Sequence, residues 1–257
     1  MKLYLLLPVI LPVFVCCQQN TGKQPASDTR IIPVHHENIF EHIRDIQCPK
    51  GYARISAEPD SFANWLRNFP LKKDKAVHLF DGSLKANQDA QFAVLELSVG
   101  NKDLQQCADA IMRLRAEYLY SRRQFKAIRF YDNNKSCFAC PENCSRAVFE
   151  KYLEKVFSYC GTLSLQKQLA DCRIDETTAG NVIIQGGSPG HAVIIVDEAE
   201  DAFGHKIYLL AQSYMPAQEM HILNNRFQKE INPWYSFESV DIQTPEWKFT
   251  NAKLKKW

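Results

Sequence analysis

A glycine-rich turn that ends in a histidine is the part of this sequence best suited to chemistry. Residues 186–190 read Gly-Gly-Ser-Pro-Gly, and His191 follows them at the start of an apolar run. Glycine takes backbone conformations that are closed to other residues and lets a ligand approach closely. Histidine changes its charge near neutral pH, which suits a general base. We therefore treat His191 as a candidate catalytic residue, and Gly187, Ser188 and Gly190 as candidate ligand contacts.

A partner that orients His191 is expected on the following strand. Two strands are predicted over residues 192–197 and 206–213, and a turn centred near 201–202 would place Gln212 opposite His191. Directly opposed residues in an antiparallel pair have Cβ atoms about 5 Å apart. A register error of one would replace Gln212 with one of its neighbours.

Cys160 is the candidate nucleophile. It lies just before a helix expected over residues 162–169, and a helix N-terminus stabilises a thiolate and lowers its pKa. A cysteine at a helix start, a histidine on a later strand and a polar residue on the next strand is the arrangement of papain-like thiol hydrolases. Cys160 would attack an amide carbonyl, His191 would transfer protons, and Gln212 would orient His191 or help to hold the oxyanion. The interval between Cys160 and His191 is short for this class.

A second interpretation makes the same turn part of a binding pocket without catalysis. Tyr214 and Gln218 would join the turn in the pocket, and Arg113 and Arg115 could supply charge for an acidic ligand. The sequence favours this ligand-binding domain, for a cell-wall or small-molecule ligand. The alternative is a papain-like thiol hydrolase acting on amide bonds, such as those of peptidoglycan peptides.

A third interpretation is an enzyme that does not use Cys160. His191 would then work with a carboxylate such as Asp81 or Glu117, whose place in the fold the sequence does not give.

The nine cysteines bear on the redox environment of the protein. Cys137-x2-Cys140-x3-Cys144 could ligate zinc or part of an iron–sulfur cluster, but an oxidising compartment favours a loop braced by a disulfide. We therefore expect neither a metal nor another cofactor. Cys107 falls on the apolar stripe of a helix, which predicts a core position. Outside Cys16 and Cys17 an odd number remains, so at least one is unpaired or pairs between chains: Cys48, Cys107, Cys137, Cys140, Cys144, Cys160 and Cys172.

The N-terminus predicts export. Met1 and Lys2 precede an apolar run, Leu3 to Val15, that is too short to span a bilayer as a helix, which needs roughly 20 residues. The cysteine that follows predicts a lipoprotein signal, with Cys17 as the lipidated residue and plain secretion as the alternative. We expect a signal peptide over residues 1–17, a flexible tether over 18–38 and one globular domain over 39–257.

The charge of the chain limits the classes of partner that the sequence predicts. The formal net charge is +2, with both signs mixed along the 257 residues, so no concentrated basic face indicates nucleic acid. The expected location is the cell envelope, at a membrane surface reached through the lipid anchor or in the periplasm.

The pattern of apolar residues predicts an α+β domain with a mixed or antiparallel sheet packed with several helices, and a papain-like arrangement is among those it allows. Asp103 is expected to open the clearest helix, and the C-terminal segment to be irregular. The expected helices lie over 39–46, 60–68, 103–118, 145–157 and 162–169, and the expected strands over 92–98, 128–131, 181–185, 192–197 and 206–213.

Several blocks of the chain resemble a known family. Two of the longest are DLQQCADAIMRLRAEYLY, from Asp103 to Tyr120, and QGGSPGHAVIIVD, from Gln185 to Asp197. The chain resembles the bacterial lipoprotein family known as domain of unknown function 4846, from about residue 50 onward. The resemblance implies export and a single domain, and it implies no established activity. The remaining blocks are 81–85, 161–165, 209–218, 233–235 and 244–247.

Overall fold

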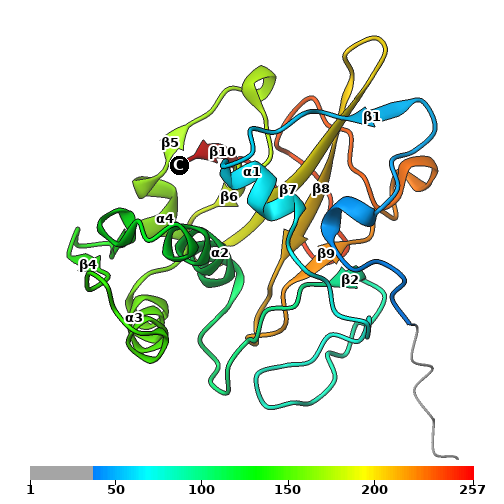
Figure 1. Cartoon of the computed structure of the whole chain (residues 1–257). Helices are drawn as coiled ribbons and strands as arrows, with labels where there is room; N and C mark the ends of the chain where they lie inside the picture. The colour runs from blue at the N-terminus through cyan, green and yellow to red at the C-terminus, as the bar shows by residue number, and fades with distance from the viewer. Residues whose placement is uncertain (1–36) are drawn as a thin grey trace, which may run out of the picture. The chain divides into compact units, whose positions relative to one another are not determined.

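The computed structural model describes residues 37–257 (Figure 1). The expected signal peptide, with Cys17, and nearly all of the expected tether lie outside these residues. Within residues 37–257, no helix is long and apolar enough to cross a membrane. The helices of this part are α1 (Phe62–Arg67), α2 (Cys107–Ser121), α3 (Arg146–Tyr159) and α4 (Thr162–Gln168), joined by short 3-10 turns over Ile43–Asp45, Phe125–Ala127, Ile174–Glu176 and Lys229–Ile231.

An antiparallel sheet forms the centre of the described part. Its strands follow the order β2-β9-β8-β7-β6-β10-β5, and β1 pairs with the far end of β7. The α+β class expected from the sequence is confirmed. The strands are β1 (Tyr52–Arg54), β2 (Gln91–Val94), β5 (Ala170–Asp171), β6 (Val182–Gln185), β7 (His191–Asp201), β8 (Lys206–Gln212), β9 (His221–Leu223) and β10 (Lys253–Lys256), and a separate hairpin consists of β3 (Arg129–Tyr131) and β4 (Cys137–Ala139).

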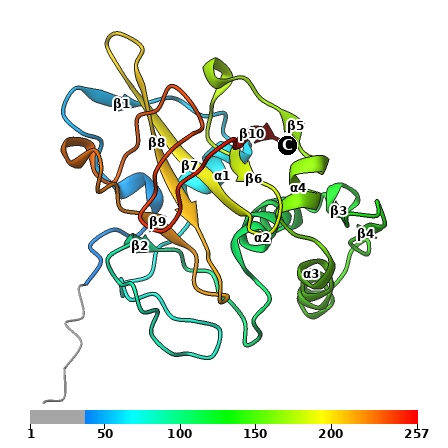
Figure 2. The same cartoon turned by 180° about the vertical axis from the view of Figure 1, so that it is seen from behind.

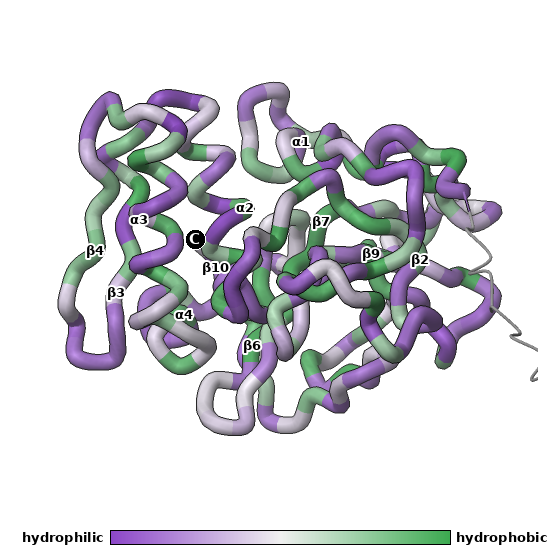
Figure 3. The backbone as a smooth tube through the Cα atoms, turned by 90° about the horizontal axis from the view of Figure 1, so that it is seen from below, coloured by the Kyte–Doolittle hydropathy of each residue, from purple (hydrophilic) through white to green (hydrophobic). Residues whose placement is uncertain are grey.

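The central strands are apolar on both faces because both faces are covered. Successive side chains of a strand point to opposite faces. Ala192 and Ile194 of β7 pack in the core that includes the helices, whereas Val193 and Ile195 pack in a second core with Phe249 of the C-terminal segment. Figure 2 shows this orange-to-red segment in front of the sheet, and Figure 3 colours β6 and β7 as largely hydrophobic. A run without alternation is what a strand buried on both faces requires.

The pairing of β7 with β8 differs from the expected register by two residues. Ile194 pairs with Ala211, and the register shifts at a bulge around Val196. Gln212 is therefore diagonal to His191 rather than directly opposite. Because side chains alternate with a period of two, this shift leaves Gln212 and His191 on the same face of the sheet.

Helix α2 begins later than expected. The sequence predicted that Asp103 opens it, but residues 103–106 are irregular and Gln106 is the N-cap. The backbone N–H of Gln106 donates to Asp109 Oδ2, at 3.1 Å, which satisfies one of the free donors at the helix start. Cys107 is therefore the first helical residue of a helix that packs against β7.

The cysteine-rich segment connects the β3–β4 hairpin to α3. Cys137 lies exposed on β4 and Cys140 is buried. The sulfur atoms of Cys140 and Cys144 are 3.5 Å apart, and the seven cysteines of the described part are free thiols. Among residues 37–257, no three histidine, cysteine, aspartate or glutamate side chains are placed to hold a metal ion together.

Candidate functional site

The glycine-rich turn fixes the position of His191 at the first residue of β7. A Cβ atom on Gly190 would lie 2.5 Å from the carbonyl oxygen of Gly187 and 2.5 Å from Thr162 Oγ1, so only glycine fits there. The Thr162 hydroxyl, at the first residue of α4, donates to the carbonyl of Gly187 at 3.2 Å. These contacts hold the turn against α4 and fix the position of the histidine that follows it.

The His191 ring is enclosed by aromatic side chains. Its exposed fraction is 0%, and its centroid lies 4.9 Å from that of Tyr214, 5.2 Å from that of Trp247 and 5.7 Å from that of Phe249. Burial lowers the pKa of His191 to about 4, and the hydrogen bond with Gln212 offsets part of this change. The imidazole is therefore neutral at physiological pH.

Gln212 determines which ring nitrogen of His191 carries the proton. Gln212 Nε2 donates to Glu246 Oε2 at 2.9 Å and lies 3.5 Å from His221 Nε2. Because an ionised carboxylate only accepts, the Gln212 amide nitrogen faces Glu246 and its oxygen faces His191. That oxygen is 2.8 Å from His191 Nε2, which must therefore carry the hydrogen. His191 Nδ1 is left unprotonated, and among residues 37–257 it has no hydrogen-bond partner.

A buried cation supports Glu246 in turn. Lys85 Nζ lies 2.9 Å from Glu246 Oε2, with a side chain only 5% exposed, and Asn87 Nδ2 donates to Glu246 Oε1 at 3.3 Å. Burial lowers the pKa of Lys85, and the hydrogen bond to Glu246 opposes this change. His221 Nδ1 donates to the carbonyl of Glu219 at 2.9 Å. The hydrogen bonds from His191 through Gln212 to Glu246 thus have a defined direction, and the ion pair with Lys85 completes the chain.

The Cys107 thiol lies close to the strand that begins with His191. The backbone N–H of Ala192, the residue after His191, is near enough to the Cys107 sulfur to favour the thiolate. Burial raises the pKa of the Cys107 thiol to about 11 and the charge of Asp109 raises it further, against the effect of the N–H groups of Ala108 and Ala192. The sequence predicted a core position for Cys107, and the side chain is indeed only 5% exposed.

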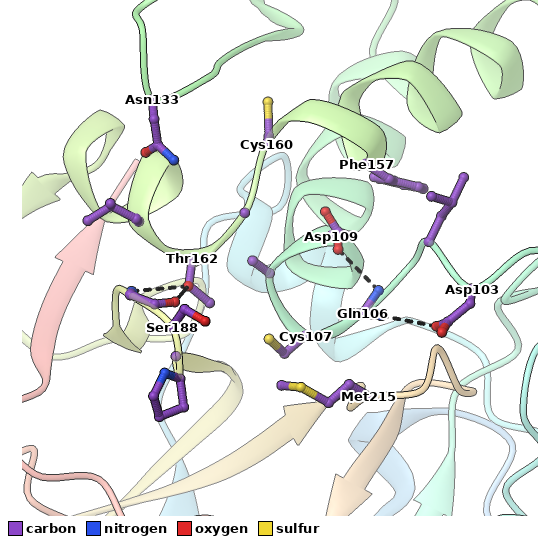
Figure 4. A pocket seen from close by; sticks show the side chains of 17 residues that line it. Asp103, Gln106, Cys107, Asp109, Asn133, Phe157, Cys160, Thr162, Ser188 and Met215 are labelled. Atoms are coloured by element: carbon purple, nitrogen blue, oxygen red, sulfur yellow. Dashed lines mark hydrogen bonds between the residues drawn. The ribbon is translucent and has the colours of Figure 1, made fainter.

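A pocket of about 370 Å³ opens at the start of α2 (Figure 4). Cys107 and Cys160 both line it, together with the predicted ligand contacts Gly187, Ser188 and Gly190. The structure therefore brings the glycine-rich turn next to two thiols. His191 and Gln212 are both 0% exposed and do not line this pocket.

Cys160 lies between two helices, just before α4 as the sequence predicted. It is the residue that ends α3, and α4 begins only at Thr162. Burial raises the pKa of the Cys160 thiol to about 12 rather than lowering it, as it raises that of Cys107 to about 11. Among the described residues, no hydrogen bond joins Cys160 or Cys107 to His191, and in Figure 4 the Cys160 sulfur points away from Cys107. The thiol at the start of a long helix is that of Cys107.

The two predicted arginines lie elsewhere. Arg113 is 9% exposed, pairs with Glu117 at 3.2 Å and donates to the carbonyl of Ser98 at 3.2 Å. The Arg115 guanidinium lies over the rings of Phe62, Tyr118 and Trp257. Neither lines the pocket beside Cys107, so neither can contact a ligand there.

Three further predicted residues have separate surroundings. Gln218 is 2% exposed and its carbonyl accepts from Ser213 Oγ at 2.7 Å, outside the lining of the pocket. Asp81 accepts from the Ser83 hydroxyl at 2.6 Å, and Glu117 binds Arg146. The carboxylate that acts on His191 is Glu246, through Gln212.

Comparison with known proteins places the chain in a family. Residues 43–140 and 131–256 match the family described as "Domain of unknown function (4846)", and the two segments together cover most of the chain. The chain belongs to this family. Membership of domain of unknown function 4846 implies no particular activity. No curated protein and no solved structure matches the chain.

Sequence reasoning missed the roles of Cys107, Glu246 and Lys85. The spacing of Gln106 and Asp109 is the signal that could have placed Cys107 at the first helical position. Glu246 lies 34 residues beyond Gln212 in a segment without regular structure, and no pattern of types or spacing connects the two.

Proposed function

We propose that this protein is a thiol hydrolase that cleaves amide bonds, with Cys107 as the nucleophile and His191 as the general base. One observation carries the proposal. The Cys107 thiol, at the first residue of α2, lines a pocket with the glycine-rich turn that ends at His191, whose tautomer leaves Nδ1 unprotonated. A nucleophile at a helix start, a base on a strand and an amide that orients the base form the triad of such enzymes.

The pKa values of the two groups define the first chemical step. A thiol with a pKa near 11 and an imidazole with a pKa near 4 are both neutral at pH 7. His191 therefore takes the thiol proton as the Cys107 sulfur attacks the amide carbonyl. The imidazolium then gives this proton to the leaving amine as the C–N bond breaks and a thioester remains. Water, deprotonated by His191, hydrolyses the thioester and restores the thiol.

Helix α2 contributes to the electrostatics of this step. The first N–H groups of a helix have no partners within the helix and carry partial positive charge. At the first position of α2, Cys107 lies in this field, and the nearby N–H of Ala108 favours its thiolate. The same groups are suited to stabilise negative charge on the attacking sulfur and on the carbonyl oxygen of the substrate.

We also propose that the enzyme acts in the cell envelope, lipid-anchored through Cys17, on amides such as those of peptidoglycan stem peptides. The N-terminal apolar run followed by a cysteine supports the anchor. Labelling of expressing cells with a fatty-acid analogue tests it. The wild-type chain should incorporate the label and Cys17→Ala should not.

Binding without catalysis has less support than hydrolysis. The pocket beside the glycine-rich turn could hold a ligand, and both thiols line it. A simple binding site has no use for a histidine whose tautomer is fixed by two further residues.

A comparison of three variants tests the hydrolase. We expect purified protein to release new amino groups from peptidoglycan stem peptides, measured by mass spectrometry of the products. Cys107→Ala should lower the rate at least a thousandfold, because no other group replaces the nucleophile. Cys160→Ala is the matched control and should stay within threefold of wild type. Full activity in Cys107→Ala would refute the proposal, and loss confined to Cys160→Ala would make Cys160 the nucleophile.

A further inference from the structure

Asp109, the third residue of α2, has an oxygen that the helix does not use. Its Oδ2 accepts from the N–H of Gln106 at 3.1 Å, and this bond completes the cap. Its Oδ1 is buried and, among residues 37–257, has no hydrogen-bond partner, in a residue only 6% exposed. A buried polar atom without a partner is destabilising. Capping alone therefore does not explain a carboxyl group at this position.

The pocket beside Cys107 is where this carboxyl group lies. Asp109 lines the same cavity as both thiols, and its charge acts on Cys107 and on Cys160. Figure 4 shows Asp109 between the two cysteines along the wall of the pocket. Because Asp109 and Cys107 line the same pocket, one ligand there can contact both residues.

The lining of the pocket has only negative formal charge. It contains Asp103 and Asp109, and the described residues that line it include no lysine, arginine or histidine. Asp103 Oδ1 is already occupied, since it accepts from Gln106 Nε2 at 3.0 Å and from the N–H of Ala217 at 2.7 Å. Asp109 Oδ1 is the buried carboxyl oxygen of this lining that has no hydrogen bond among residues 37–257.

Charge and hydrogen bonding both select a cation for this position. Burial raises the pKa of Asp109 well above its usual range, because a carboxylate without a counter-charge is poorly solvated there. A primary ammonium group would donate to Oδ1 and supply the opposite charge that stabilises the carboxylate. A neutral or anionic group could do only part of this or none.

We infer that Asp109 binds an ammonium group of the substrate, which makes the substrate an amide with a free amino group about one residue from the scissile carbonyl. This inference rests on the proposed hydrolase and names its substrate class, an aminoacyl amide or a peptide with a free N-terminus. Asp109 would then act in specificity, and Cys107 and His191 in chemistry.

A binding experiment on Cys107→Ala separates this subsite from catalysis. The two compounds are L-alanyl-L-alanine amide and L-lactyl-L-alanine amide, in which a hydroxyl replaces the amino group at nearly the same size. We expect calorimetry at pH 7 to give at least tenfold tighter binding of the amino compound. Asp109→Asn in the same background should remove this preference. Asp175→Asn is the control, because Asp175 is exposed and pairs with Arg173, and should keep it.

Each result of this experiment either supports or overturns the proposed ammonium subsite. Equal affinity for the two compounds, or binding of neither at 10 mM, overturns the subsite. If Asp109→Asn does not fold, the affinities of Cys107→Ala for the two compounds are enough to test the subsite. If wild-type protein hydrolyses both compounds equally, the hydrolase stands and the subsite fails. A preference in binding without turnover by the wild type supports the subsite and refutes the hydrolase.

Discussion

The state of His191 depends on residues that are distant in the sequence. Gln212, on the neighbouring strand, fixes its tautomer, and Glu246, from the C-terminal segment, fixes the orientation of Gln212. The Lys85 ammonium compensates the charge of Glu246 in a buried setting. Each of these contacts fixes the orientation of the next side chain. The imidazole is left neutral, with one unprotonated nitrogen.

Replacement of Gln212 tests this arrangement. In Gln212→Ala, His191 loses the acceptor that holds the hydrogen on Nε2, and the ring can turn or change tautomer. We expect kcat to fall about 10- to 100-fold, as for other residues that orient a functional histidine, with little change in KM. Glu246→Gln should give part of this loss, because Gln212 can then flip. An unchanged kcat in Gln212→Ala would exclude the orienting role.

The candidate site could be predicted only in part from single residues. His191 and Gln212 followed from the strand pattern, and a register error of two did not separate them because it preserved the face. Cys107 was missed since an apolar stripe and a helix start look alike until the first helical residue is known. Glu246 was beyond prediction, because only the tertiary fold brings its segment to Gln212.

At the scale of elements, the segment between β4 and α3 carries a close pair of thiols. Cys140 and Cys144 have sulfur atoms 3.5 Å apart, and a small shift would allow a bond. We predict a Cys140–Cys144 disulfide in protein isolated from an oxidising compartment. Peptide mapping without reduction should find this pair, with Cys107 free.

The energetic effect of this disulfide should be modest. A loop this short loses roughly 2 kcal/mol of unfolded-state entropy on closure, so reduction should lower the free energy of unfolding by about that amount. A Cys107 that forms a disulfide in the active protein would contradict both this pairing and the proposed nucleophile.

The sequence predicted best the elements with long apolar or amphipathic runs. Strands β6, β7 and β8 and helices α2, α3 and α4 were recognised because such runs fit only one kind of secondary structure. Strand β10 was missed, since its sequence Lys-Leu-Lys-Lys carries no such signal. It joins the sheet because β6 offers a partner and Asp171 pairs with the buried Lys255.

At the scale of the whole molecule, two buried histidines make stability depend on pH. The pKa of His191 is lowered to about 4 and that of His221 to about 3, both by burial, from an ordinary value of 6.5. Below pH 6.5 the two histidines become protonated in the unfolded chain, whereas in the folded chain they stay neutral until the pH approaches their lowered pKa values. Stability is therefore complete above pH 6.5 and is lost as the pH falls toward these lowered values.

Urea unfolding at two pH values measures this effect. Between pH 7.5 and pH 5 we expect the free energy of unfolding to fall by about 2 kcal/mol for each histidine. The raised pKa of Asp109 acts in the opposite sense, so the comparison with His191→Asn isolates one contribution. This variant should lose about 2 kcal/mol less over the same interval. An identical pH dependence in the two proteins would show that His191 is not buried as described.

The most direct test of the account is to find the residue that becomes acylated. L-Alanine p-nitrophenyl ester, mixed with protein and quenched in acid within seconds, should leave an acyl group on a thiol if a thioester forms. Peptide mapping should place the added mass on the peptide that contains Cys107, with much slower labelling in His191→Ala. Labelling of Cys160 instead, or equal rates with and without His191, would contradict the account.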